Sequence, residues 1–597
     1  MRSLGLFMRF VPSESQRVFI LTLVIGAVSG LAAVSFHLAI IECEKLLIEP
    51  AISAPGGSGY LMLVLVPTLG GLVSGIALYY VVPGARGSGI PQVKVAYSVK
   101  GGRLPLRDVI GKFAIGVLQI GSGASLGREG PTVHICAGIA TNLGRTFALS
   151  QKNVKRLLPV GVAAGIAAAF NAPIAAVTFT IEEIVGDLDQ TVLSGVIVAA
   201  AIAAAIERGI LGEHPVFTIT ESYGLNYGSS LLFYAILGIA AGGISLAFSE
   251  SLLQLRSLFR KFERLPGWAQ PAIGGIVTGL LILTALYFFQ TAGINGGGYE
   301  TLSAALAGKL AVKVMAVLCL LKLAATVFSY SSGGAGGIFA PSLFVGGMLG
   351  GVIGVIDVNL LQHPSNEVGA FALVGMGAVF AGVVRAPITS ILIIFEMTGS
   401  YGLILPLMIA NMTSYALARR FRPVPIYEAL LEQDNIFLPH PGKMPAHPLE
   451  RIRVSDAMIT DVVTLWPSMT AASAFEMIQQ YEITTFPVID DSSACVGVIT
   501  ELRLRRTVAS GRGELTIGEL ADRCSTVYPD HLLDRALYRM NKAAVRQLSV
   551  VERSAGHRFV GIIAMADIIR VQAEAIGAKS AGDAPDAVDI HSTLAGP

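Results

Sequence analysis

Charged residues are scarce in this chain of 597 residues. Asp, Glu, Lys and Arg make up 14% of it and hydrophobic residues 53%, whereas an ordinary soluble domain is roughly 25% charged. One water-soluble core cannot bury so much apolar surface, so most of that surface must face lipid. The net charge of +2 and the lack of any basic run give no electrostatic footprint for a nucleic-acid partner.

Cysteine is also rare, and its spacing predicts no metal site. The five cysteines form no Cys-x-x-Cys pair, so we expect buried free thiols and no disulfide framework at Cys43, Cys136, Cys319, Cys495 and Cys524. Phosphate-binding loops, zinc-protease motifs and nucleophile elbows are missing, which argues against an enzyme. No small-residue cleavage site follows a short apolar core, so the first apolar stretch is predicted to be a retained membrane helix.

Long apolar stretches fill the chain up to about residue 425. Some are long enough to cross a bilayer, which takes roughly 20 helical residues. Others are short or interrupted by Gly and Pro, as in transporters whose broken helices meet near the middle of the membrane. The stretches are Val18–Ile41, Tyr60–Val82, Phe113–Ile120, Leu157–Ile181, Val192–Ile206, Leu231–Phe248, Ile273–Phe289, Val312–Phe328, Val368–Val384 and Leu403–Ala418.

An internal repeat divides this apolar region into two halves. The segment from Val160 to Glu182 aligns without a gap with the segment from Val374 to Glu396. Both begin with Val-Gly, break at Ala-Pro and close on Glu, and a Gly-rich segment ending in Pro precedes each. The pattern predicts an all-α membrane domain built by duplication, a frequent design among transporters.

The composition becomes ordinary after residue 430, where a second repeat begins. We divide the chain into a transmembrane domain (1–430), a Pro/His-rich linker (431–450), two small domains (451–510 and 515–576) and a disordered tail (577–597). The sequence pattern of each small domain predicts an amphipathic helix, two short Val/Ile strands and a closing helix. The tail is rich in Ala, Gly, Asp and Ser.

Three Gly-rich segments of the apolar region are built to start helices: Gly87–Pro91, Gly127–Pro131 and Gly336–Pro341. Gly allows close backbone approach, and Pro fits the first turn of a helix. Helix N-termini carry partial positive charge and bind anions through backbone N–H groups. Several such ends that converge would hold an anion weakly enough to release it.

The segments GSGIP, GREGP and GGIFAP resemble the three anion-site signatures of the CLC family of chloride channels and chloride/proton antiporters. The resemblance covers roughly residues 15–430, and the C-terminal repeat resembles a tandem pair of CBS domains. It implies two inverted halves of broken helices, a homodimer with one pore per subunit, and chloride and protons as the transported ions. A multi-pass location in a bacterial inner (plasma) membrane with cytoplasmic CBS domains is expected.

Family roles apply only where the residues match. By resemblance, the hydroxyls of Ser88 and Tyr427 bind a central chloride, and the backbone N–H groups of Ile338 and Phe339 complete its shell. Glu129 would be the gating glutamate, whose carboxylate competes with the anion. Nitrate-preferring relatives have Pro in place of Ser88, so the serine favours chloride. The chain departs from the family by having Gln92 after GSGIP, where Glu is common.

The repeat separates structural glutamates from functional candidates. Glu182 aligns with Glu396, so both are expected to cap or pair within the fold, whereas Glu129 aligns with Phe339 and Glu183 with Met397. An ionisable group in a membrane segment costs about 2.5 kcal/mol or more and is a functional candidate by default. Family antiporters carry Glu at the position of Glu183, which makes it the predicted proton entry, while a solvated interfacial role is the alternative.

In the CBS-like pair, an Asp of the closing helix commonly holds a nucleotide ribose. Asp567 occupies that place in the second copy, which makes an adenine nucleotide the candidate ligand. Arg503 stands at the equivalent place in the first copy, and Ala564 replaces the usual hydroxyl residue, so the nucleotide site is less complete than in the family pattern.

Three hypotheses about the function remain. The leading one is a secondary transporter that exchanges chloride for protons, and the nearest rival is a passive chloride channel on the same fold. A CBS-regulated cation transporter is the distant rival, because it would need acidic residues along its pathway in place of backbone donors.

Overall fold

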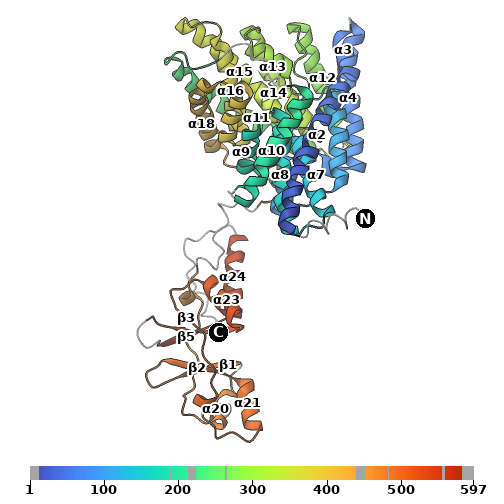
Figure 1. Cartoon of the computed structure of the whole chain (residues 1–597). Helices are drawn as coiled ribbons and strands as arrows, with labels where there is room; N and C mark the ends of the chain where they lie inside the picture. The colour runs from blue at the N-terminus through green and yellow to red at the C-terminus, as the bar shows by residue number, and fades with distance from the viewer. Residues whose placement is uncertain are drawn as a thin grey trace. The chain divides into compact units, whose positions relative to one another are not determined.

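A computed structural model describes residues 13–54, 56–186, 190–212, 223–262, 265–438, 452–481, 483–553 and 558–580. The chain divides into a membrane unit (Met1–Pro441) and a C-terminal unit (Gly442–Pro597), which Figure 1 shows with their helices and strands. Most of the predicted linker and of the predicted tail lies outside the described residues, although the last helix continues to Ser580.

All helices and strands assigned in the described part of the membrane unit are helices. Its helices are α2 (Glu14–Leu47), α3 (Glu49–Ser53), α4 (Gly57–Ile76), η1 (Ala77–Val81), η2 (Pro83–Ala85), α5 (Ile90–Ser98), α6 (Leu106–Gly121), α7 (Glu129–Thr146), α8 (Gln151–Phe170), α9 (Pro173–Phe179), η3 (Thr180–Val185), α10 (Gln190–Leu211), α11 (Ser230–Lys261), α12 (Gln270–Phe289), α13 (Tyr299–Leu306), α14 (Val312–Ser331), α15 (Phe339–Leu361), α16 (Glu367–Val384), α17 (Pro387–Thr398), η4 (Tyr401–Leu403), α18 (Ile404–Phe421) and α19 (Ile426–Gln433).

Within the described residues, ten helical segments are long and apolar enough to cross a membrane. They match the predicted stretches with two exceptions. Phe113–Ile120 lies in the shorter helix α6, and Leu157–Ile181 runs past the end of α8 at Phe170 into α9 and η3. The ten segments also include α15, which the sequence patterns marked only as a Gly-rich segment. That omission was wrong because the glycines of α15 pack against other helices and do not interrupt it.

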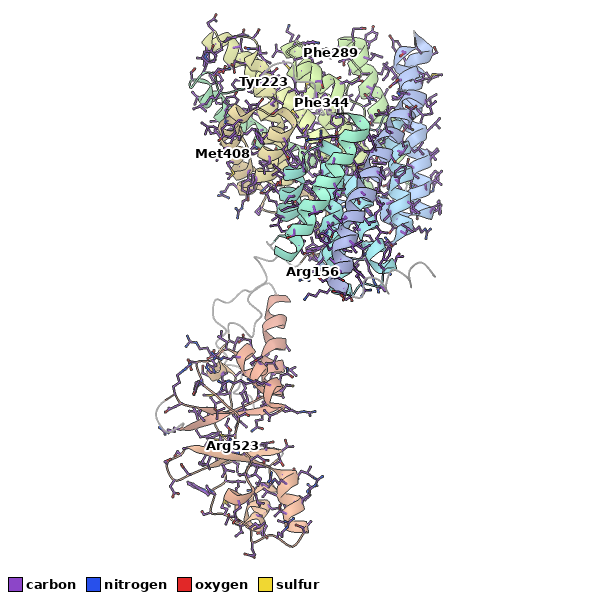
Figure 2. The ribbon with its side chains drawn as sticks, in the orientation of Figure 1. Arg156, Tyr223, Phe289, Phe344, Met408 and Arg523 are labelled. Atoms are coloured by element: carbon purple, nitrogen blue, oxygen red, sulfur yellow. The ribbon has the colours of Figure 1, made fainter. Side chains whose placement is uncertain are left out.

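Apolar side chains cover much of the outside of the membrane unit. Leu61, Leu232 and Leu320 are each more than 60% exposed, and Met408, labelled in Figure 2, is 48% exposed. Leaving so much apolar surface in water would be costly, at roughly 25 cal/mol per Å². The exposed surface therefore agrees with a lipid environment.

The two halves of the repeat are joined by a reciprocal pair of helix caps. Glu182, at the end of the first half, accepts a hydrogen bond from the backbone N–H of Thr389 (2.8 Å) in the first turn of α17. Glu396, its counterpart, accepts one from the N–H of Ala175 (2.6 Å) in the first turn of α9. Carboxylates at helix N-termini satisfy unpaired N–H groups and favour the helix dipole. The predicted structural role of these two glutamates is confirmed.

Glycines let helices α15 and α16 pack in direct backbone contact. A Cβ atom at Gly375 would overlap the carbonyl oxygen of Gly346, and one at Gly346 would overlap the carbonyl oxygen of Gly375. Both residues are buried. Small residues at such crossings allow the close packing that drives helix association in membranes.

The C-terminal unit contains two copies of the predicted helix–strand–strand–helix pattern. The first has η6 (Val454–Asp456), α20 (Ala471–Ile478), β1 (Thr485–Ile489), β2 (Cys495–Thr500) and α21 (Glu501–Ala509), and the second has α22 (Ile517–Leu520), β3 (Thr526–Val527), α23 (Leu533–Ala543), β4 (Gln547–Val551), β5 (Phe559–Ala564) and α24 (Met565–Ser580). Strands β1 and β2 pair antiparallel, as do β4 and β5, while β3 and β4 are parallel.

All five cysteines are free, but not all are buried as predicted. Cys136 and Cys319 are buried, whereas Cys43, Cys495 and Cys524 are half-buried. The Cys524 thiol lies 3.5 Å from the carbonyl oxygen of Cys495. This contact joins the start of β2 to the residues before β3, which sequence spacing did not predict.

Replacing Gly375 with Ala is expected to destabilise the membrane unit by about 1–3 kcal/mol, because the new methyl group must push α15 and α16 apart. Gly243 in α11 is the matched control, because a Cβ there meets nothing within 4 Å. Thermal unfolding of the detergent-solubilised protein should show a midpoint lowered by several degrees for Gly375→Ala and an unchanged or raised midpoint for Gly243→Ala. Equal midpoints for the two variants would contradict the packing argument.

Candidate ion-transport site

The three Gly-rich segments start helices, as predicted. Helix α5 begins at Ile90, α7 at Glu129 and α15 at Phe339. The segments before α7 and α15 are joined by two backbone hydrogen bonds of 2.7 Å between Gly127 and Gly337. The first turn of α7 also abuts the segment before α5, since a Cβ at Gly130 would lie 2.6 Å from the carbonyl oxygen of Ser88. Three helix N-termini therefore lie close together.

The four predicted chloride ligands are fully buried in the membrane unit. Ser88, Ile338, Phe339 and Tyr427 each have a relative exposure of 0%. The Ser88 hydroxyl oxygen accepts a hydrogen bond from the N–H of Ile90 (3.3 Å). The Tyr427 hydroxyl lies close enough to the Ser88 side chain to interact with it, but it makes no hydrogen bond of good geometry within the described residues. An unsatisfied buried hydroxyl next to a second hydroxyl is suited to receive an anion.

The Glu129 side chain lies at the N-terminus of α15. It is fully buried, and its Oε2 atom is 3.4 Å from the backbone N–H of Ala340. Its Oε1 atom accepts a hydrogen bond from the Tyr299 hydroxyl. A carboxyl oxygen thus occupies the place where the helix end favours an anion.

Sequence analysis did not identify Tyr299, which contacts Arg128 and follows a loop that Lys322 holds in place. The Arg128 guanidinium lies 5.5 Å from the centre of its ring, a cation–π distance. The buried Lys322 ammonium donates to the carbonyl oxygens of Ile294 (2.9 Å) and Gly296 (2.6 Å) in the loop that leads to α13. These contacts fix the loop and direct the tyrosine hydroxyl to Glu129.

Aromatic rings from both halves of the repeat surround the start of α15. The Phe339 ring packs against Phe170 (4.8 Å between centres), Phe179 (5.9 Å) and Phe380 (4.2 Å). All four side chains are buried. Phe179 ends α9, which continues directly into η3 with Glu183. Buried apolar rings therefore pack from the start of α15 to the helix that leads to Glu183.

Glu183 belongs to a buried cluster of three charged side chains. Its carboxylate lies 2.8 Å from the Lys94 ammonium, which also lies 3.2 Å from the carboxylate of Glu428. The side chains of Lys94, Glu183 and Glu428 are 9%, 5% and 16% exposed. The low exposure of Glu183 argues against the alternative of a solvated, interfacial side chain. Two carboxylates sharing one ammonium leave one negative charge uncompensated when both are ionised.

Sequence reasoning missed Lys94 and Glu428 as well. One signal was available for each: Lys94 is the single charge in the apolar helix α5, and Glu428 directly follows the predicted ligand Tyr427. A charge within an apolar membrane segment is a functional candidate. Their pairing spans 334 residues of sequence, which no local pattern reveals.

The predicted nucleotide ligand Asp567 lies in the C-terminal unit, apart from the other site residues. Its Oδ2 atom accepts a hydrogen bond from the N–H of Ala564 (2.9 Å), just before α24. Its Oδ1 atom lies 3.6 Å from the Arg570 guanidinium, and the side chain is 11% exposed. The carboxylate therefore has a structural partner, and nucleotide binding at Asp567 stays a prediction.

Comparison with known proteins identifies relatives of both units. Residues 70–419 match the family described as voltage gated chloride channel, and residues 454–510 and 517–574 match the CBS domain. The H(+)/Cl(-) exchange transporter ClcA of Salmonella paratyphi B is 31% identical over 422 residues, covering 69% of this chain and 88% of that protein. ClcA of Salmonella newport gives the same values.

Solved structures agree with this assignment. A slow cyanobacterial Cl-/H+ antiporter aligns with a TM-score of 0.62 and 29% identity, covering 70% of this chain and 98% of its own. A eukaryotic CLC transporter aligns over 92% of this chain and 98% of its own, with a TM-score of 0.59 and 20% identity, which bears on the fold alone. The chain belongs to the CLC family of voltage gated chloride channels and carries two CBS domains after its membrane unit.

Proposed function

We propose that this protein is a secondary transporter that exchanges chloride for protons across a membrane, with Glu129 as its gate and Glu183 as its proton entry. The position of the Glu129 carboxylate at the N-terminus of α15 carries the proposal. Ionised, the side chain competes with chloride for the helix end; protonated, it loses the charge that holds it there. The exchange activity named for the ClcA relatives supports the same conclusion.

Chloride binding needs no cation in this scheme. Ser88 and Tyr427 supply hydroxyl donors, and the backbone N–H groups of Ile338 and Phe339 supply the rest. Partial charges hold the anion less tightly than a lysine or arginine would, so that it can leave toward either side. Replacing the Ser88 hydroxyl by the ring of Pro would remove one of these donors.

The Lys94 cluster supports a proton route through Glu183. Glu183 and Glu428 share the Lys94 ammonium, so uptake of one proton by the two carboxylates makes the cluster neutral. Buried clusters of zero net charge are less costly than charged ones, and the two carboxylates titrate as a pair. The cluster can therefore accept and release a proton while Lys94 keeps its charge.

A passive chloride channel is the second candidate. The 2.8 Å contact between Lys94 and Glu183 favours it, because a permanently ionised Glu183 would be a structural ion pair and not a proton carrier. Measurement of chloride and pH together in liposomes separates the two candidates.

Glu129→Gln is expected to allow chloride flow without proton coupling, because the amide keeps the shape but carries no charge to compete with the anion. In liposomes, an imposed chloride gradient should no longer drive proton uptake in the variant, while chloride still equilibrates. The same substitution at Glu42, an exposed residue of α2, is the control and should behave as wild type. Proton pumping that persists in Glu129→Gln would show that Glu129 is not the gate.

Tyr299→Phe is expected to raise chloride flux and weaken its coupling to protons, because Glu129 loses the hydroxyl that holds its carboxylate at the start of α15. A hydrogen bond to a charged group contributes about 1.5–3 kcal/mol, so chloride should displace the side chain more easily. Chloride flux and vesicle pH are recorded together. A variant that only loosens the fold would lower both fluxes in proportion, and that result would remove Tyr299 from the gate.

Glu183→Gln is expected to abolish proton movement while chloride movement continues, because chloride is bound by hydroxyl and N–H groups that the substitution leaves in place. Glu428→Gln is the comparison, since it keeps the Glu183 carboxylate and should keep part of the coupling. Chloride flux and vesicle pH are recorded together. If wild type moves chloride without a proton signal, the protein is a channel. If Glu183→Gln loses both fluxes, Glu183 maintains the fold.

A further inference from the structure

Two thiols lie side by side where the two CBS domains meet. Cys495 begins β2 in the first domain, and Cys524 precedes β3 in the second. The Cys524 sulfur lies 3.5 Å from the carbonyl oxygen of Cys495, and the Cys495 sulfur lies 3.7 Å from the carbonyl oxygen of Gly497. The two thiol groups are close enough to interact with each other. They form a pair of nucleophiles that the proposed transport mechanism does not use.

The backbone brings the two cysteines to the spacing of a disulfide. Val498 of β2 and Asp522 exchange both backbone hydrogen bonds (2.9 and 2.8 Å) as an antiparallel pair. Two residues away from this pair, the antiparallel register sets Cys524 opposite Val496, the neighbour of Cys495. Adjacent strands lie about 4.7–4.9 Å apart, and the Cα atoms of a disulfide usually lie about 4.4–6.8 Å apart. The two segments are therefore close enough for a bond between the sulfur atoms.

Small molecules can reach the pair from solvent. Both cysteines are half-buried, and Val496 beside Cys495 is 49% exposed. Arg523, which precedes Cys524 and is labelled in Figure 2, is exposed as well. The buried thiols of Cys136 and Cys319, which contact backbone carbonyl oxygens of the membrane unit, lack this access. Exposed disulfides are the ones that form and break readily.

The two thiols differ in acidity. The hydrogen bond with Cys495 lowers the pKa of Cys524 to about 7. The same contact, together with burial, raises the pKa of Cys495. The thiolate is the form that attacks a disulfide. An accessible, acidic thiol beside a second, resolving thiol is the arrangement of redox-sensing cysteines.

We propose that Cys495 and Cys524 are a reversible oxidation site, at which a small-molecule disulfide converts the two thiols into a disulfide bond between the CBS domains. This site goes beyond the proposed chloride/proton exchange and does not rest on it. The bond would hold β2 of the first domain against the segment that leads to β3 of the second. It would close a loop that contains β2, α21 and α22.

The chemistry proceeds in two exchange steps. The Cys524 thiolate attacks one sulfur of the small-molecule disulfide, and a thiolate leaves, so that Cys524 carries a mixed disulfide. The Cys495 thiol then loses its proton, attacks the Cys524 sulfur and displaces the second small thiolate. Two protein thiols are oxidised and one small disulfide is reduced to two thiols, which take up the two protons.

The test uses the full chain in detergent, incubated with mixtures of oxidised and reduced glutathione. Free thiols are blocked with an alkylating reagent before the protein is denatured, and the digested protein is analysed by mass spectrometry. The peptide linked through Cys495 and Cys524 should increase with the share of oxidised glutathione. It should fall by about tenfold or more after dithiothreitol is added.

Single substitutions separate the roles of the two thiols. Cys495→Ser should keep glutathione attached to Cys524, because no second thiol displaces it. Cys524→Ser should leave Cys495 unmodified, because the attacking thiol is missing. Cys43→Ser is the matched control, since Cys43 is also half-buried but lies in α2 of the membrane unit. This variant should give the linked peptide as wild type does.

Three results would overturn the oxidation site. The first is a wild-type protein in which Cys495 and Cys524 stay free at every glutathione ratio. The second is wild type that keeps glutathione on Cys524 without forming the linked peptide. The third is a linked peptide that appears only when the thiols are blocked after denaturation, because the bond would then form in the unfolded chain.

Discussion

The two backbone hydrogen bonds between Gly127 and Gly337 are the contact on which the site depends. They join the Gly-rich segments of the two halves, so the first turns of α7 and α15 begin side by side. A Cβ at Gly127 would meet the Glu129 carboxylate, and one at Gly337 would lie 3.1 Å from the carbonyl oxygen of Gly127, so any larger residue would have to push its neighbours aside. Because α7 begins with Glu129, the same contact places a carboxylate at the N-terminus of α15. The proposed gate and the helix end are parts of one structural unit.

Three buried lysines of the membrane unit bind carbonyl or carboxylate oxygens. Lys112 donates to the carbonyl oxygen of Gly87 (2.6 Å), and Lys322 donates to those of Ile294 and Gly296. Lys94 pairs with two carboxylates. The lysines thus bind carbonyl or carboxylate oxygens, and backbone N–H and hydroxyl groups are left for the anion.

Local patterns and the repeat predicted the helix starts and the caps at Glu182 and Glu396, because both follow from residue types at fixed spacing. The same repeat singled out Glu129 and Glu183. The partners of these two acids were not predictable: Tyr299 is 170 residues from Glu129, and Lys94 is 89 residues from Glu183. Such pairs are set by how helices cross, which leaves no periodic signal.

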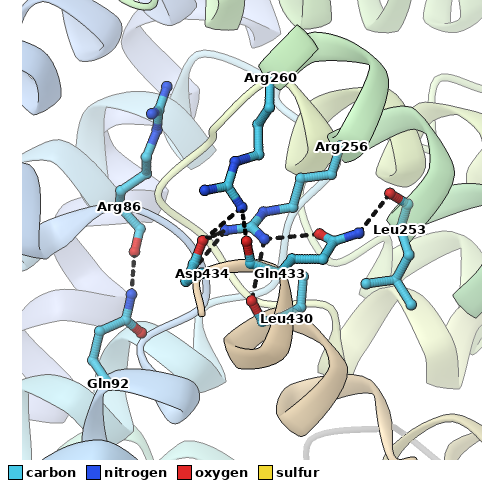
Figure 3. A network of polar contacts seen from close by, with 8 residues as sticks. All are labelled: Arg86, Gln92, Leu253, Arg256, Arg260, Leu430, Gln433 and Asp434. Carbon is cyan, nitrogen blue, oxygen red and sulfur yellow. Dashed lines mark hydrogen bonds and ion pairs between the residues drawn. The ribbon is translucent and has the colours of Figure 1, made fainter. Parts of the chain in front are cut away.

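Helix α19 connects the proposed chloride site with the proposed proton entry. Tyr427 and Glu428 are consecutive residues of this short helix, so their side chains point in different directions from it. One lies beside Ser88 in the proposed chloride site, and the other bonds Lys94 and thereby meets Glu183. Arg256 and Arg260 hold the far end of the same helix at Asp434 (Figure 3). A shift or rotation of α19 must therefore change the hydroxyl offered to chloride and the charge balance around Glu183 together. Coupling between the ions then needs no direct contact between chloride and proton, because one rigid helix belongs to both sites.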